Sequence, residues 1–113
     1  MKRSEIWLIN LDPTIGAETR KTRPAVIVSD DALGILPLKV IVPITDWKPR
    51  YSTADWMVRL DPDQTNHLSK PSAADCFQVR SLSDLRMVRK IGEVDTLKMA
   101  EIEDALGKVL NIK

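Results

Sequence analysis

Five short runs of β-branched and other apolar residues, separated by turn-forming residues, restrict this chain to a fold built mainly from strands. The runs lie at residues 6–9, 24–29, 38–44, 56–60 and 73–80. β-branched residues pack well on a pleated surface, and the prolines, aspartates and glycines between the runs favour turns. We therefore predict five strands by residue 80, followed by a sixth short strand or a turn at 86–94.

The end of the chain has a helical pattern instead. Met99, Ile102, Leu106 and Val109 recur at intervals of three and four residues, with charged residues between them. Asp95 precedes this stripe, and aspartate is a favoured N-cap residue. Strands followed by one helix predict a mainly β fold, a small antiparallel barrel or twisted sheet with a C-terminal amphipathic helix packed against it.

Length, cysteine use and hydropathy indicate one intracellular domain. The 113 residues fit a single domain over 1–113, and the one cysteine, Cys76, excludes an internal disulfide and suits a reducing compartment. No apolar stretch reaches the roughly 18 residues that span a bilayer, and no signal-peptide-like apolar segment follows the charged first residues. We expect a cytoplasmic protein that does not contact the membrane.

The charges of the chain nearly cancel, but they are unevenly placed. With 17 basic and 16 acidic residues, we expect no global attraction to nucleic acid. Basic residues cluster locally at Arg20, Lys21 and Arg23, and again at Arg80, Arg86, Arg89 and Lys90. Such clusters line an anion-binding groove or form ordinary solvated surface.

Few side chains offer reactive chemistry. His67 is the only histidine and lies in a polar loop, so a two-histidine acid–base pair or a histidine-rich metal site is excluded within one chain. Cys76 lies in an apolar run without a neighbouring base, which predicts a buried, inert thiol. Glycine-rich phosphate and dinucleotide motifs are absent. We predict neither a metal nor a cofactor.

The polar segment between residues 12 and 24 ends in a candidate anion-binding residue. Arg23 directly precedes Pro24, which begins an apolar run, so the arginine is mounted on a constrained backbone. This arrangement suits bidentate binding of phosphate, and a surface ion pair is an equal alternative. Thr45 ends another run, where its hydroxyl could face the same open end of the sheet or simply begin a turn.

Aromatic residues alternate with cations after residue 46. Trp47, Tyr51 and Trp56 flank Lys48 and Arg50, a combination that suits single-stranded nucleic acid. The alternative is packing within the fold, in the core for Trp56 and in the loop for Trp47.

Several blocks of the sequence together resemble the MazF/PemK family of toxin endoribonucleases. The blocks follow the family's order at residues 5–18, 21–29, 36–45, 68–72, 76–82 and 90–92. The resemblance implies an SH3-like β-barrel with a terminal helix, a homodimer, and a type II toxin that cleaves single-stranded RNA at short sequences without a metal. It also implies a MazE-like antitoxin whose tail covers the RNA groove, with DNA bound only through that antitoxin.

The resemblance assigns roles to particular residues. The family's central catalytic residues correspond to Arg23 and Thr45, and the acidic residue of its first loop corresponds to Glu18. Without a metal, RNA is cut most readily when its 2′-OH attacks the adjacent phosphate, leaving a 2′,3′-cyclic phosphate and a 5′-OH. We expect Arg23 to clamp the phosphate, Thr45 to donate a hydrogen bond and Glu18 to act as base. The residues expected to bind RNA are Arg20, Lys21, Trp47, Lys48, Arg50, Lys70, Gln78 and Arg80.

One departure from the family concerns the residue before Gln78. Some relatives have aspartate there, whereas this chain has Phe77. Asp75 lies two residues earlier and would face the same side as Phe77 in a continuous strand, so we consider it as a substitute acid or base. Two other functions stay open, a non-enzymatic toxin of the same fold such as a gyrase poison, and an inactive co-regulator.

Overall fold

The computed structural model describes residues 1–11 and 22–112. Its main elements are β1 (Glu5–Asn10), β2 (Thr22–Ile27), β3 (Leu38–Asp46), β4 (Met57–Leu60), β5 (Ser72–Asp75), β6 (Arg80–Ser83), β7 (Met87–Glu93) and α1 (Thr96–Leu110). Short 3₁₀ helices occur at Asp31–Leu33, Pro49–Thr53, Cys76–Gln78 and Asp84–Arg86. The β-branched runs thus form strands, and the terminal stripe forms the helix.

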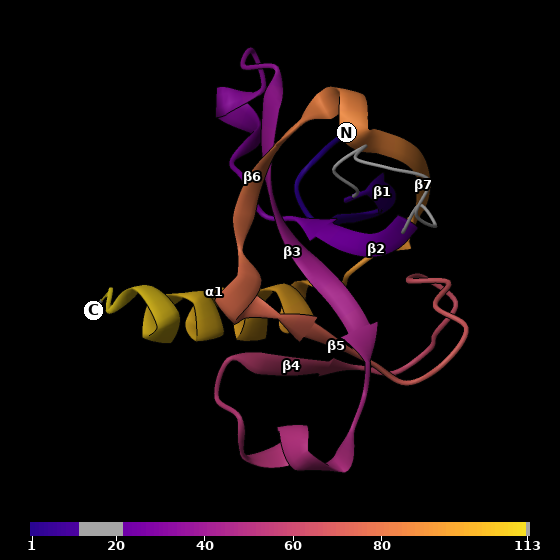
Figure 1. Ribbon diagram of the computed structural model, residues 1–113, viewed down its shortest axis with the longest axis vertical. Helices are drawn as coiled ribbons and strands as arrows, with labels where there is room; N and C mark the ends of the chain where they lie inside the picture. The colour runs from indigo at the N-terminus through magenta and orange to yellow at the C-terminus, as the bar shows by residue number, and fades with distance from the viewer. Residues whose placement is uncertain (12–21, 113) are drawn as a thin grey trace, which may run out of the picture.

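The strands make one antiparallel sheet in the order β4-β5-β3-β2-β1-β7. β3 crosses the middle of the molecule (Figure 1) and pairs with β2 on one edge and with two strands in succession on the other. Because β4 and β7 end the order, the sheet of the described residues is twisted but not closed into a barrel. The predicted twisted antiparallel sheet with a C-terminal helix is confirmed.

The prediction of one strand over 73–80 is wrong. β5 ends at Asp75, the 3₁₀ helix Cys76–Gln78 follows, and a new strand, β6, begins at Arg80. The Asp75 carboxylate accepts a hydrogen bond from the backbone N–H of Phe77 at 3.2 Å and thereby caps the short helix. A local side chain to backbone bond of this kind competes with strand pairing, which an alternating apolar pattern does not reveal.

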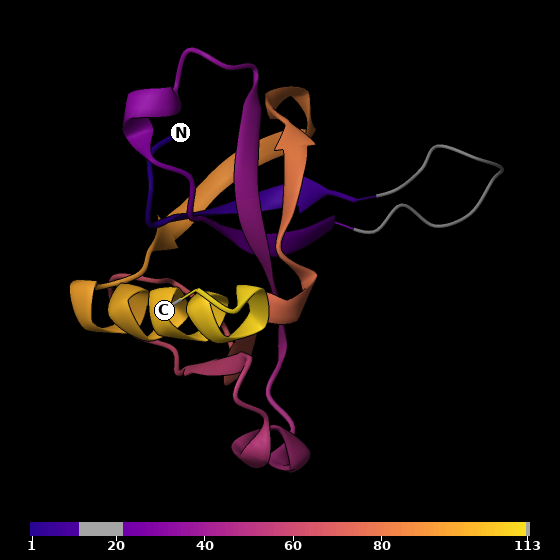
Figure 2. The same ribbon diagram turned by 90° about the vertical axis from the view of Figure 1, so that its left-hand side faces the viewer.

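Buried side chains cover both faces of the central strands, as expected where neighbours along a strand point to opposite sides. One core joins Ile6, Val26, Val42 and Ile44 to Met99, Ile102 and Ala105 of α1. The other consists of Ile9, Ala25, Ile27, Ile41, Leu82 and Met87. α1 therefore closes one face only, where it packs against β4 and the 3₁₀ helix Cys76–Gln78 (Figure 2).

The helix begins and ends as its sequence requires. The Asp95 side chain accepts a hydrogen bond from the backbone N–H of Lys98 at 2.8 Å, so the predicted N-cap is confirmed. Asn111 ends the helix in the left-handed conformation, with φ of 57°. No helix within the described ranges is long and apolar enough to cross a membrane.

A buried carboxylate ties the N-terminus to the last strand. Glu5 accepts hydrogen bonds from the Trp7 indole N–H and the Lys2 backbone N–H, both at 2.9 Å, and its other oxygen lies 3.2 Å from Lys90 Nζ. Burial alone would raise the pKa of Glu5, but these donors outweigh it and lower the pKa from 4.5 to about 2.

This lowered pKa predicts an acid-sensitive contribution to stability. The contribution is complete above the unfolded pKa near 4.5 and is lost as pH falls towards 2, because the unfolded chain binds the proton first. Between pH 5 and 2, the free energy of unfolding of the wild type should fall further than that of Glu5→Gln, by at most about 3 kcal/mol. Urea titrations across this range measure the difference, and parallel pH profiles would contradict it.

Cys76 sits fully buried in the core shared with α1, which confirms the predicted buried thiol. Burial, with a smaller effect of the neighbouring Asp75 charge, raises the pKa of the thiol to about 12. We predict negligible alkylation by iodoacetamide at pH 8 in the folded protein, where only about one thiol in 10⁴ is ionised, and complete alkylation in guanidinium chloride. Mass spectrometry distinguishes the two, and rapid labelling of the native protein would show that this core opens.

Candidate active site

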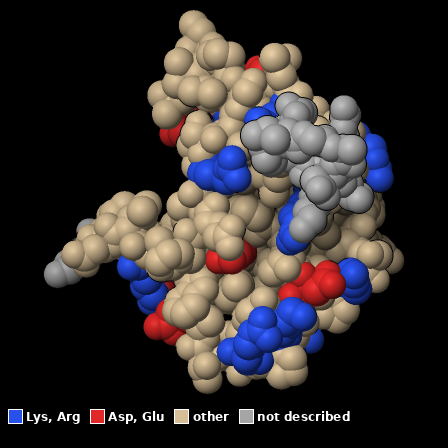
Figure 3. All heavy atoms as spheres, in the orientation of Figure 1, with Lys and Arg blue, Asp and Glu red and all other residues tan. Residues whose placement is uncertain are grey.

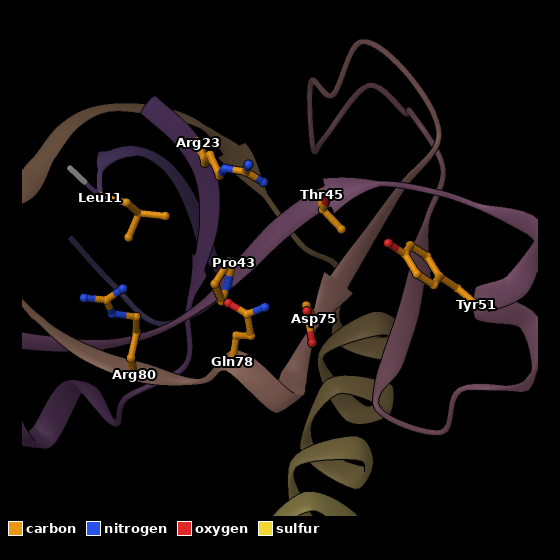
Figure 4. Close-up of a pocket in the computed structure, with 8 residues that line it drawn as sticks. All are labelled: Leu11, Arg23, Pro43, Thr45, Tyr51, Asp75, Gln78 and Arg80. Atoms are coloured by element: carbon orange, nitrogen blue, oxygen red, sulfur yellow. The ribbon is translucent and has the colours of Figure 1, made fainter. Parts of the chain in front are cut away.

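Arg23 and Thr45 lie on neighbouring strands, just beyond the last residues that pair. The pairing of β2 with β3 ends at Ala25 and Pro43, and the hollow beyond this pair is lined by both Arg23 and Thr45. Because alternate residues share a face, both side chains project on the side of Pro43. Figure 4 shows the Arg23 guanidinium extending towards the Thr45 side of a cavity. The two residues predicted at the centre of the site are therefore brought together.

The cavity between them has a volume of about 390 Å³. Its lining residues are Leu11, Arg23, Pro43, Thr45, Tyr51, Asp75, Gln78 and Arg80. A second hollow of about 660 Å³ adjoins it and shares Arg23 and Thr45 with it. An extended ligand that occupies both hollows would therefore pass over these two residues.

The interrupted edge of β3 explains why a hollow forms here. β6 pairs with β3 from Leu38 to Ile41 and β5 pairs with it from Ile44 to Asp46, so both partner strands stop beside Val42 and Pro43. Proline has no N–H to donate to a ladder, which makes this position suited to a gap in pairing. The 3₁₀ helix that bridges the gap brings Gln78 to the wall of the cavity.

Asp75 is the only carboxylate among the described residues that line the smaller cavity. It stands at the end of β5, on the same wall as Gln78 (Figure 4). The continuous strand through Asp75 and Phe77, on which the expectation of strand alternation rested, is wrong, because β5 ends at Asp75. Asp75 lines the cavity with Arg23 and Thr45, whereas Phe77 does not.

The residues predicted to bind RNA fall into three groups. Gln78 and Arg80 line the smaller cavity, and Lys48 and Lys70 line the larger hollow, where Lys70 pairs with Asp46 at 3.1 Å. Trp47 and Arg50 line neither. Arg20 and Lys21 lie outside the described residues, as does Glu18, the predicted base.

Trp47 and Arg50 belong to a row beside the cavity in which two aromatic rings lie between two cations. The Arg50 guanidinium lies 5.3 Å from the centre of the Tyr51 ring, which meets Trp47 edge to face at 5.8 Å. On the other side of Trp47, the Arg59 guanidinium lies 4.9 Å from its ring centre. Lys and Arg atoms gather on this part of the surface, over β4 and the 3₁₀ turn that follows β3 (Figure 3).

Leu11, Pro43 and Arg59, which lie at or beside the cavity, were not predicted as site residues, and Tyr51 was considered only as one of the aromatic residues that suit nucleic acid. Pro43 forms part of its lining, Tyr51 points its hydroxyl towards the cavity (Figure 4), and Arg59 covers Trp47. A proline inside a β-branched run was a usable signal, because proline in a strand marks an edge or a gap. Nothing local in the sequence predicts the position of Arg59.

His67 has a structural role. Its Nδ1 lies 2.8 Å from the carbonyl oxygen of Ile91, and its backbone has φ of 55°, so it holds a tight loop against β7. It lines neither hollow. Within the described part of the chain, no group of three histidine, cysteine, aspartate or glutamate side chains is placed to hold a metal ion.

The sequence is similar to those of known endoribonucleases. The endoribonuclease MazF9 of Mycobacterium tuberculosis is 32% identical over 118 residues, covering 99% of this chain and 98% of the relative. The endoribonuclease PemK of Escherichia coli is 45% identical over 62 residues, 54% of this chain and 47% of the relative.

Solved structures show the same fold. A MazE–MazF crystal structure from Deinococcus radiodurans superposes with a TM-score of 0.83 at 23% identity, covering all of this chain and 97% of the other. A mycobacterial endoribonuclease in complex with its cognate antitoxin superposes with a TM-score of 0.78 at 21% identity, with the same coverage. The sequence model of the family of PemK-like and MazF-like toxins matches residues 2–110. The chain therefore belongs to the PemK/MazF family of toxins of type II toxin–antitoxin systems.

Proposed function

We propose that this protein is a toxin endoribonuclease that cleaves single-stranded RNA without a metal ion. The observation that carries the proposal is the position of Arg23 and Thr45 at the junction of two hollows, with Asp75 on the wall of one of them. Relatives of similar length bear the name endoribonuclease, which supports the same reaction here.

The chemistry uses the 2′-OH of the substrate as nucleophile. Its oxygen attacks the adjacent phosphorus, the bond to the 5′-oxygen breaks, and the products are a 2′,3′-cyclic phosphate and a 5′-OH. A base must take the proton of the 2′-OH, charge on the phosphorane must be stabilised, and the leaving oxygen must gain a proton. DNA lacks the nucleophile and is not a substrate.

The site offers a group for the first two of these tasks. The Arg23 guanidinium stabilises the negative phosphoryl oxygens, and the Thr45 hydroxyl donates a hydrogen bond to one of them. Asp75 is the carboxylate that the described cavity supplies as a base, and Glu18 is the other candidate. The single variants Asp75→Asn and Glu18→Gln assign the base, because only one of them should remove the acidic limb of the pH–rate profile.

The rest of the groove suits the RNA backbone and bases. Gln78 and Arg80 line the smaller cavity, and Lys48 and Lys70 line the larger hollow next to it, so each hollow offers polar or positively charged groups to the RNA. The row of Arg50, Tyr51 and Trp47 then offers ring faces for bases beyond it.

An antitoxin with an acidic tail fits the same groove. The cations that would hold phosphates would equally hold carboxylates, so tail and RNA would compete for one surface. Solved structures in this fold include complexes with a cognate antitoxin. We propose that a MazE-like antitoxin inhibits this protein by covering the groove and supplies its only link to DNA.

A second copy of the chain would cover an apolar patch at the other end of β3. Its exposed residues are Leu33, Ile35, Leu36, Leu38 and Leu85. Pairing of Leu38 with Ser83, and a hydrogen bond from Asp84 N–H to the Pro37 carbonyl, bring the two segments together. Exposed apolar patches of this kind mark protein interfaces, which supports the homodimer that the family resemblance implies.

Replacing Arg23 should nearly abolish cleavage without unfolding the protein. Arg23→Ala removes a preorganised donor to the phosphorane, which typically costs about 10²–10³-fold in rate, and Thr45→Val should cost about 10-fold or more. Single-turnover cleavage of a long RNA measures both. Arg89→Ala, at an exposed position of β7 outside both hollows, is the control. More than a tenth of wild-type activity in Arg23→Ala would remove Arg23 from the mechanism.

A charge placed in the apolar patch should separate the subunits. Ile35 is 93% exposed and Leu85 is 92% exposed, so Ile35→Asp and Leu85→Asp leave the fold intact but put carboxylates into the proposed interface. Sedimentation should then shift from dimer to monomer, whereas Leu97→Asp on the exposed face of α1 should stay dimeric. An unchanged dimer in both patch variants would place the interface elsewhere.

A further inference from the structure

Two aromatic rings are exposed next to the candidate active site. Phe77 is 67% exposed and Trp56 is 41% exposed, and their rings meet at 6.0 Å between centroids and 67° between planes. Core packing was the expected alternative for Trp56 and is wrong. Large apolar rings left in water at the edge of a functional groove commonly bind something flat and apolar.

Backbone bonds hold the two rings in place. The N–H of Cys76 donates to the Trp56 carbonyl at 2.9 Å, and the N–H of Phe77 donates to the Asp75 carboxylate. Because the side chain of Cys76 is fully buried against α1, the short 3₁₀ helix turns the next residue, Phe77, outwards. The ring pair is thus a preformed platform on a rigid element.

A further hollow of about 360 Å³ lies at this platform. Its lining residues are Trp56, Asp75, Phe77 and Gln78. Asp75 and Gln78 also line the cavity that holds Arg23 and Thr45, so the two hollows lie on either side of the same pair of polar side chains. A strand bound in the cavity therefore continues directly onto the aromatic rings.

We infer that Phe77 and Trp56 form a base-stacking subsite for one nucleotide next to the cleaved bond, and that Gln78 reads the edge of that base. The inference rests on the proposed ribonuclease function and adds to it the residues that choose the substrate. Aromatic faces stack on any base, whereas the side-chain amide offers one donor group and one acceptor and so distinguishes base edges. Phe77, which stands where some relatives have aspartate, thus gains a binding role in this chain.

Loss of the Phe77 ring should weaken RNA binding at one nucleotide only. The probe is a labelled 2′-O-methyl oligonucleotide of about 10 nucleotides, which spans a binding groove and cannot be cleaved. Fluorescence anisotropy should show about 10-fold weaker binding by Phe77→Ala. Phe77→Trp should restore the affinity, and Leu97→Ala, an exposed apolar residue of α1 outside this hollow, should not change it.

Abasic substitutions along the oligonucleotide locate the partner base. At one position, removal of the base should weaken binding by the wild type about as much as Phe77→Ala does. The same abasic oligonucleotide should bind Phe77→Ala no more weakly than the intact one does, because both changes remove the same contact. Gln78→Ala should flatten the base preference at that same position. Additive losses at every position, or unchanged affinity in Phe77→Ala, would overturn the subsite.

Different experimental results would overturn this subsite and the proposed function. A wild type that neither cleaves RNA nor binds the oligonucleotide overturns both. A wild type that cleaves RNA through Arg23 while Phe77→Ala binds and cleaves normally overturns the subsite alone. A loss of dimer in Phe77→Ala, with unchanged affinity per subunit, would show instead that the rings pack against a second copy.

Discussion

The arrangement of the site depends on one interruption in the pairing of β3. On one edge β3 pairs with β2 from Ile41 to Pro43, and on the other edge β6 and β5 both stop beside Val42 and Pro43. The segment between them cannot continue as a strand, because Asp75 caps a 3₁₀ helix and Cys76 is drawn into the core against α1. The same interruption opens the cavity, brings Gln78 to its wall and turns Phe77 outwards.

The strands beside this gap hold the side chains of the site in position. Arg23 and Thr45 stand on paired strands whose alternate residues are buried in the second core, so their side chains start from well-held backbones. A site that must stabilise a phosphorane gains most from donors that are already in position. The buried apolar residues on both faces of β2 and β3 therefore serve the site as well as the fold.

Much of this could be predicted from the sequence, and the limits have physical causes. β-branched runs, the periodic stripe after Asp95 and the N-cap are local signals, so the helix and most of the strands were predicted correctly. The break after Asp75 was missed because burial of Cys76 depends on α1, which lies far along the chain. The break also ends strand alternation between Asp75 and Phe77. Trp56 was weighed as a core residue because its apolar run continues into β4, but it precedes that strand and is exposed. Arg59 joins the site only because the fold brings β4 against Trp47 of another segment.

A crystal structure with bound substrate analogue tests the central claim most directly. An RNA with a single 2′-deoxy sugar at the cleavage position cannot react, since the nucleophile is missing, but should bind as the substrate does. The account predicts the phosphate after that sugar within hydrogen-bond distance of both the Arg23 guanidinium and the Thr45 hydroxyl, with the chain continuing over Gln78. A strand bound elsewhere on the protein, with these two residues facing solvent, would contradict it.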